Sequence, residues 1–219
     1  MNEKADQTAL LSALTTEHFV LQTAYSSTVS EAAGRSTLYV MALSSSLIAM
    51  GFLSQSQELF KPFVATVLPA VFLLGLFTVV RLVDTGLESM HYLTGIARIR
   101  GFYRTLGGQA AEHFTPEQGR WPEVESPAER LGAFTAFLGT TASMIAVINS
   151  VVAGAVVSFA VHAVAPTSPD WLGIAAGVAS ALMLVAAFLT YQRWRFAVFD
   201  ATIRRARPDA APDDSGQRA

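Results

Sequence analysis

The sequence predicts an all-α polytopic membrane protein with four transmembrane helices and cytoplasmic helical extensions. Four stretches carry no charged residue, namely residues 36–57, 62–80, 131–161 and 171–192. Each is about as long as the ~20 residues that an α-helix needs to cross a bilayer. Charged residues make up 15% of the chain, against about 25% in soluble domains. The mean hydropathy is +0.39. A β-barrel would instead show short segments of alternating polarity.

We expect one four-helix transmembrane domain over residues 1–207 and a disordered tail over residues 208–219. The predicted spans are residues 37–55, 62–83, 133–162 and 171–192. The tail consists mainly of Asp, Ala, Pro, Ser and Gly without apolar periodicity, which is typical of disorder.

Two long helices are predicted to extend beyond the membrane. Residues 6–34 repeat apolar side chains every three or four positions, which indicates an amphipathic cytoplasmic helix that packs against the second long helix. Residues 61–106 form a helix of about 69 Å at 1.5 Å per residue. The hydrocarbon core is only about 30 Å thick, so half of this helix projects into the cytoplasm. Gly107 and Gly108 provide the stop signal.

The distribution of Lys and Arg predicts the orientation in the cell membrane. Lys61 is the only Lys or Arg in the two turns that join span one to span two and span three to span four. The middle linker and the C-terminal segment are rich in Arg, and such residues collect on the cytoplasmic side. Both termini are therefore expected to be cytoplasmic.

A charged stripe at the cytoplasmic membrane edge is the strongest candidate site. It comprises Glu31, Arg35, Arg81, Asp84, Glu88 and His91. Asp84, Glu88 and His91 share one side of a helix, and the Glu88–His91 spacing occurs in the metal sites of helix bundles. Further ligands would have to come from the N-terminal helix, where Glu17, His18 and Glu31 lie.

An ion-pair network explains the same stripe without a ligand. At matched depth, Arg81 would pair with Glu31 and Asp84 with Arg35. We favour this interpretation because the chain has no second Glu-x-x-His motif, and we expect no metal or cofactor. A ligand-binding or ion-gating site is the third interpretation.

A second candidate site lies within the membrane. Asn149 is an amide near the middle of the third span, and Ser44, Ser45 and Ser46 form a hydroxyl cluster in the first. Such residues usually bond neighbouring helices. The alternative is a water-filled path lined by these side chains.

These features lead us to expect a homo-oligomeric, channel-like or pore-forming membrane protein of unknown permeant. A non-conducting scaffold or partner-binding protein is the alternative, and a metal-dependent membrane enzyme is the less favoured one. The expected partners are the lipid bilayer and further copies of the chain. The net charge of −2 provides no general attraction for nucleic acid. The absence of cysteine excludes disulfides and thiolate catalysis.

Overall fold

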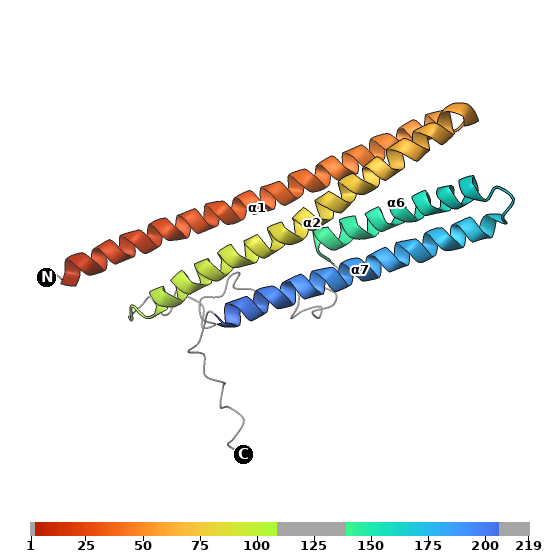
Figure 1. Ribbon diagram of the computed structural model, residues 1–219. Coiled ribbons are helices and arrows are strands. Elements are labelled where there is room, and N and C mark those ends of the chain that lie inside the picture. The colour runs from red at the N-terminus through yellow and green to blue at the C-terminus, as the bar shows by residue number, and fades with distance from the viewer. Residues whose placement is uncertain (1–2, 109–138, 206–219) are drawn as a thin grey trace, which may run out of the picture.

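The computed structural model describes residues 3–108 and 139–205, and every regular element in these ranges is an α-helix (Figure 1). The helices are α1 (Glu3–Leu53), α2 (Gln57–Arg104), α6 (Thr141–Val164) and α7 (Asp170–Arg205). All four are long and apolar enough to cross a membrane. This confirms the predicted all-helical chain with four helices of spanning length. The expected tail, residues 208–219, lies outside the described residues.

The first helix is continuous. The predicted N-terminal helix and the predicted first span are both parts of α1, which has 51 residues. Gly34 does not interrupt it, because one glycine costs a helix only about 1 kcal/mol relative to alanine. The predicted helix 61–106 corresponds to α2. The two glycines after it adopt positive φ angles, +78° at Gly107 and +56° at Gly108, which suits a chain that is leaving a helix.

The third helix begins later than the expected boundary at residue 133. Thr140 has extended backbone angles, and its side-chain oxygen accepts a hydrogen bond from the Ser143 backbone N–H at 3.2 Å. This is an N-cap, so α6 begins at Thr141. The uncharged composition continues through the cap, so hydropathy alone does not mark where the helix begins. Residues 133–138 lie outside the described part of the chain.

The helices form two antiparallel hairpins that lie side by side. Contacts join α1 to α2 and α6 to α7 along their lengths, and α2 to α6 where the hairpins meet. The four helices therefore form a row, with α1 at one edge and α7 at the other (Figure 1). The core where the hairpins meet includes Tyr39 of α1, Val71 and Val83 of α2, and Ile145 and Val152 of α6.

The buried positions of α2 follow a heptad pattern. Most of them alternate between four-residue and three-residue steps through Val64, Leu68, Val71, Gly75, Thr78, Leu82 and Thr85, and Val79 and Val83 are buried beside this row. Ile96 and Ile99 lie two heptads after Leu82 and Thr85, in the same register. A repeat of 3.5 residues is typical of left-handed coiled coils. The packing seam of α2 therefore runs along nearly its whole length.

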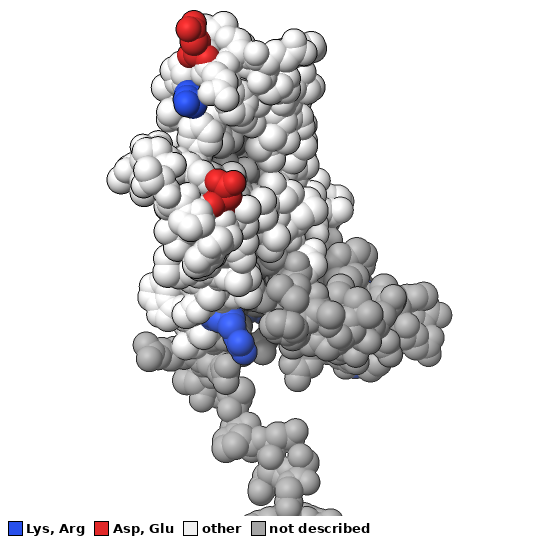
Figure 2. Space-filling model, turned by 90° about the vertical axis from the view of Figure 1, so that its right-hand side faces the viewer, with Lys and Arg blue, Asp and Glu red and all other residues white. Residues whose placement is uncertain are grey.

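The molecule divides into an apolar half and a charged half. The apolar half comprises residues 36–80 and 141–192, whose only charged residues are Glu58, Lys61 and Asp170. Figure 2 views the molecule from the end where the two hairpin turns lie, and its surface there is almost free of charge. The charged half comprises residues 3–35, 81–104 and 193–205. The two candidate sites lie at the boundary of these halves and inside the apolar half.

Candidate functional site

Arg81 connects the two long helices at the start of the charged half. Its Nε donates to Oε1 of Glu31 at 2.8 Å, and its Nη2 donates to Oε2 of Glu31 at 3.0 Å. Its Nη1 donates to Oε1 of Glu88 at 3.0 Å. The Nε of Arg35 donates to Oε1 of Glu31 at 2.8 Å. We call these four residues the charged junction. The predicted pairing of Arg81 with Glu31 is confirmed.

The charged junction is electrically balanced, with two guanidinium groups and two carboxylates. Hydrogen bonds from Arg81, and then from Arg35, lower the pKa of Glu31 from 4.5 to about 2. Glu31 therefore stays ionised at any physiological pH. Since the Glu31 side chain is only partly covered, water screens these charges. The chief effect of the junction is to fix how α1 and α2 face each other.

The sequence led us to expect an ion pair between Asp84 and Arg35, and this prediction is wrong. The Asp84 carboxylate accepts a hydrogen bond from Nη2 of Arg195 on α7. Arg35 donates to Glu31 on its own helix, and the packing of α7 against α2 brings Arg195 to the Asp84 carboxylate. Asp84 instead ties α2 to the other hairpin.

The geometry does not support the metal-site interpretation. Glu88 forms an ion pair with Arg81, Asp84 forms one with Arg195, and His91 is exposed. Glu17, the other acidic residue considered, is exposed on α1. Within residues 3–108 and 139–205, no group of three or more His, Cys, Asp or Glu side chains could hold a metal ion.

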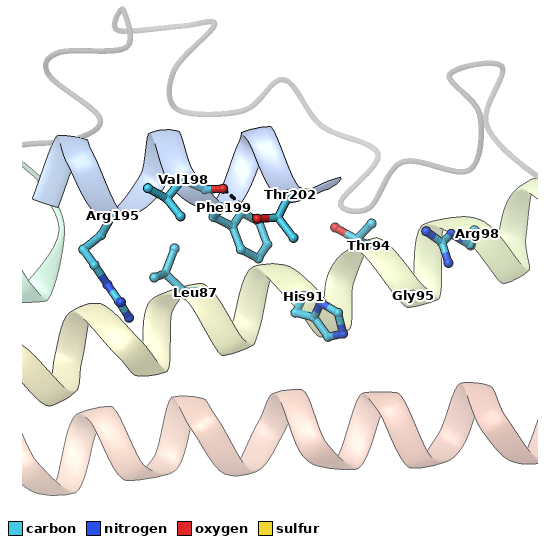
Figure 3. A pocket seen from close by; sticks show the side chains of 9 residues that line it. All are labelled: Leu87, His91, Thr94, Gly95, Arg98, Arg195, Val198, Phe199 and Thr202. Carbon is cyan, nitrogen blue, oxygen red and sulfur yellow. Dashed lines mark hydrogen bonds between the residues drawn. The ribbon is translucent and has the colours of Figure 1, made fainter. Parts of the chain in front are cut away.

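A cavity of about 460 Å³ separates the charged half of α2 from the end of α7 (Figure 3). Its residues are Leu87, His91, Thr94, Gly95 and Arg98 of α2, and Arg195, Val198, Phe199 and Thr202 of α7. Figure 3 shows Arg195 reaching from α7 toward α2, with Arg98 at the opposite end of the cavity. The hydroxyls of Thr94 and Thr202 donate to carbonyls of their own helices. The cavity therefore has an arginine at each end, with His91 and apolar side chains between them.

Asn149 is held where three helices meet. The Tyr39 hydroxyl of α1 donates to Oδ1 of Asn149 on α6 at 3.2 Å. Gly75 of α2 lies against both, since a Cβ there would be 2.1 Å from that oxygen and 2.7 Å from the Tyr39 ring. Sequence reasoning missed Tyr39 and Gly75. The available signals were the lone glycine of the 62–80 run and a tyrosine hydroxyl that needs a partner inside a span.

The serine cluster is not part of this meeting point. Ser44 and Ser45 are exposed on α1, and the Ser46 hydroxyl donates to the carbonyl of Ala42 at 2.7 Å. The intramembrane site expected from the sequence is thus divided. Asn149 lies inside the helix row, whereas Ser44 and Ser45 lie on its outer surface.

A buried polar contact that the sequence did not reveal joins α6 to α7. Gln192 is only 1% exposed, and its Oε1 accepts a hydrogen bond from the Ser143 hydroxyl at 3.2 Å. Its Nε2 donates to Oγ1 of Thr140 at 3.3 Å. The side chain of Gln192 therefore ties α7 to the capped end of α6, close to the level of the Asp84–Arg195 pair.

No protein-family model, curated protein or solved structure matches the chain. Function is therefore inferred from the described helices and side chains.

Proposed function

We propose that the protein is an integral membrane protein with four spans that self-associates as a non-conducting scaffold. In this proposal the apolar half lies in the bilayer, and both termini and the charged half lie in the cytoplasm. The observation that carries the proposal is the outer face of α1, opposite its contact with α2. Its residues are uncharged from one end of the helix to the other.

The membrane location is supported by large apolar side chains on the surface of the apolar half. Phe52 of α1, Phe77 of α2 and Leu182 of α7 are all well exposed. Exposing such an apolar surface to water is unfavourable in free energy, whereas the hydrocarbon chains of lipids solvate it. The orientation is supported by Arg81, at the boundary, and by Arg195, shortly after it, because basic residues favour the cytoplasmic side.

The outer face of α1 points away from α2. At 100° per residue, the side opposite the α2 contact passes through Ala5, Ala9, Ser12, Thr16, Phe19, Val20, Thr23, Ser27, Ser30, Gly34, Thr37, Met41, Ser45, Ile48 and Phe52. All of these are exposed, and most of them are small. Small residues allow two helix backbones to approach closely. An exposed helix in water would instead be expected to carry charges on this side.

A second copy of the chain is the occupant that fits this face along its whole length. Lipid can cover the part from Thr37 to Phe52 but not the part that lies in water. A soluble protein can cover Phe19 and Thr23 but cannot enter the bilayer. Another α1 in the same orientation has the same length and the same change of polarity. We therefore infer that copies associate through parallel α1 helices.

The scaffold proposal is also supported by how the chain uses its polar groups. The carboxylates and guanidinium groups of the charged junction bond one another, and the oxygen of Asn149 bonds Tyr39. The charged junction and the Asn149 oxygen are thus engaged in holding helices together.

Single cysteines test the association, because the natural chain contains none. Thr23→Cys and Ser45→Cys sample the outer face in the charged and apolar halves. Under mild oxidation in membranes, both should form disulfide-linked dimers. Gln22→Cys and Val40→Cys are matched controls, since these residues are exposed but lie about 100° or more from the centre of the face. Failure of both outer positions to cross-link better than the controls would exclude this interface.

A channel formed between copies is the second candidate, and the exposure of Ser44 and Ser45 is the observation that favours it. If α1 helices surround an axis, these hydroxyls would face it. Ion flux into liposomes that contain the cross-linkable protein separates the two functions. The scaffold proposal requires dimers or higher oligomers without flux. Flux that Ser45→Leu abolishes would establish the channel.

A further inference from the structure

A cavity of about 230 Å³ lies in the apolar half, where α2, α6 and α7 meet. Phe72 and Leu76 line it from α2, Asn149 from α6, and Phe188 and Tyr191 from α7. Leu76 is 43% exposed on the outer surface of the helix row. The cavity is therefore reached from the side that faces the hydrocarbon chains of the proposed bilayer.

Asn149 is a buried polar group of this cavity that lacks a full set of hydrogen-bond partners. Asn149 is only 5% exposed, and its Oδ1 accepts a hydrogen bond from the Tyr39 hydroxyl. Among the described residues, none accepts a hydrogen bond from its amide nitrogen. An amide in an apolar environment is costly unless its N–H groups are bonded. The Asn149 amide is thus a hydrogen-bond donor inside a cavity that is otherwise mainly apolar.

We propose that this cavity binds a hydrophobic molecule that carries a carbonyl oxygen on a flat ring. The oxygen would accept a hydrogen bond from the amide nitrogen of Asn149. The ring would lie among the side chains of Phe72, Phe188 and Tyr191, which favour offset or edge contacts with a second aromatic system. Apolar cavities of about 150 Å³ already take up benzene, so the available volume suits one substituted ring.

The carbonyl requirement follows from the direction of the hydrogen bond. The side-chain nitrogen of asparagine only donates, so its partner must be an acceptor. A ligand without oxygen would fill the same space and leave the N–H groups unbonded. One hydrogen bond of this kind corresponds to a preference of about tenfold.

The test compares two probes of the same shape. The ring of 4-butylacetophenone carries a carbonyl, and in 4-butyl-α-methylstyrene a C=CH₂ group replaces it. Both are equilibrated by dialysis between nanodiscs that hold the full chain and empty nanodiscs. We expect the ketone to bind about tenfold more tightly than the alkene. Equal binding of the two probes, or binding no better than to empty nanodiscs, would overturn the proposal.

Variants separate the ligand role of Asn149 from its structural role. Asn149→Leu should abolish the preference for the ketone, whereas Tyr39→Phe should keep it, because that change removes only the hydroxyl bound to the asparagine oxygen. Leu184→Trp, at the cavity wall, should block both probes, and Leu182→Trp, exposed on the same helix, should block neither. Ketone preference that survives Asn149→Leu, or unchanged binding to Leu184→Trp, would place the probes elsewhere. If Asn149→Leu does not fold, the Leu184 and Leu182 pair shows whether the probes occupy this cavity, and the ketone–alkene comparison in the natural chain and in Tyr39→Phe decides whether a carbonyl is preferred there.

Discussion

Glu31 of α1 and Arg81 of α2 form a two-pronged ion pair, in which both carboxylate oxygens accept from different nitrogens at 2.8 and 3.0 Å. The pair lies where the uncharged stretches of both helices end. A fork-to-fork contact of this kind is directional, so it specifies register as well as attraction. Sliding α1 along α2 by one turn would separate the two groups.

Arg81 should matter more than Arg35 for stability. Arg81 donates three hydrogen bonds to two carboxylates, whereas Arg35 donates one to Glu31 and is more exposed. We expect Arg81→Gln to lower the thermal unfolding midpoint in nanodiscs clearly, and Arg35→Gln to lower it by a smaller amount. Exchanging the charges of Arg81 and Glu31 should not restore the midpoint, because each new charge would lie beside a like charge. Equal losses for the two glutamine variants would contradict this ranking.

The stability provided by Glu31 should depend on pH only in strong acid. Its pKa is lowered from 4.5 to about 2, so its contribution is complete above pH 4.5 and is lost as the pH falls toward 2. The free energy of unfolding of the natural chain and of Glu31→Gln should therefore differ by a constant amount from pH 8 to pH 5. Between pH 4.5 and pH 2 the difference should shrink. A difference that already falls between pH 7 and pH 5 would show that another group controls the junction.

Thr28 and Ser89 should form a disulfide when both are replaced by cysteine. Their hydroxyl oxygens are 2.6 Å apart across the α1–α2 contact, and the chain has no competing cysteine. Oxidation should link the pair within one chain, visible as faster migration in non-reducing electrophoresis. The control is Ser27→Cys with Ser89→Cys, because residue 27 is turned about 100° away from residue 28. Equal linking of both pairs would mean that the register described here is not the one in solution.

Gly75→Ala should destabilise the meeting point of α1, α2 and α6. The added Cβ would collide with Asn149 and Tyr39, and overpacking of this kind costs about 1–3 kcal/mol. Gly86→Ala is the matched control on the same helix, because nothing lies within 4 Å of its Cβ position. That change should stabilise the helix by about 0.5–1 kcal/mol. Chemical unfolding in detergent measures both, and a neutral Gly75→Ala would argue against close packing of the three helices.

Individual residues show how far sequence patterns reach. Arg81 and Glu31 carry opposite charges and lie at matched ends of two uncharged runs. These two properties were enough to predict that they pair. The partner of Asp84 was not predictable in this way. Arg35 and Arg195 both lie near a span end, and only the packing of α7 against α2 makes Arg195 the nearer one. Likewise, Asn149 was recognisable as a polar group in a span, but its contact with Tyr39 lies 110 residues away in the chain.

Local sequence alone predicts the helical class, four apolar helices of spanning length, and the end of α2 at two glycines, although not where α6 begins. These properties depend on local composition and backbone preference, which each segment carries without its neighbours. Only the packing of the helices shows which hairpin Asp84 contacts, which groups surround Asn149, and which side of α1 stays open. Those outcomes depend on the register and rotation of helices relative to one another. Rotation matters because a turn of 100° replaces one side chain at a contact by the next.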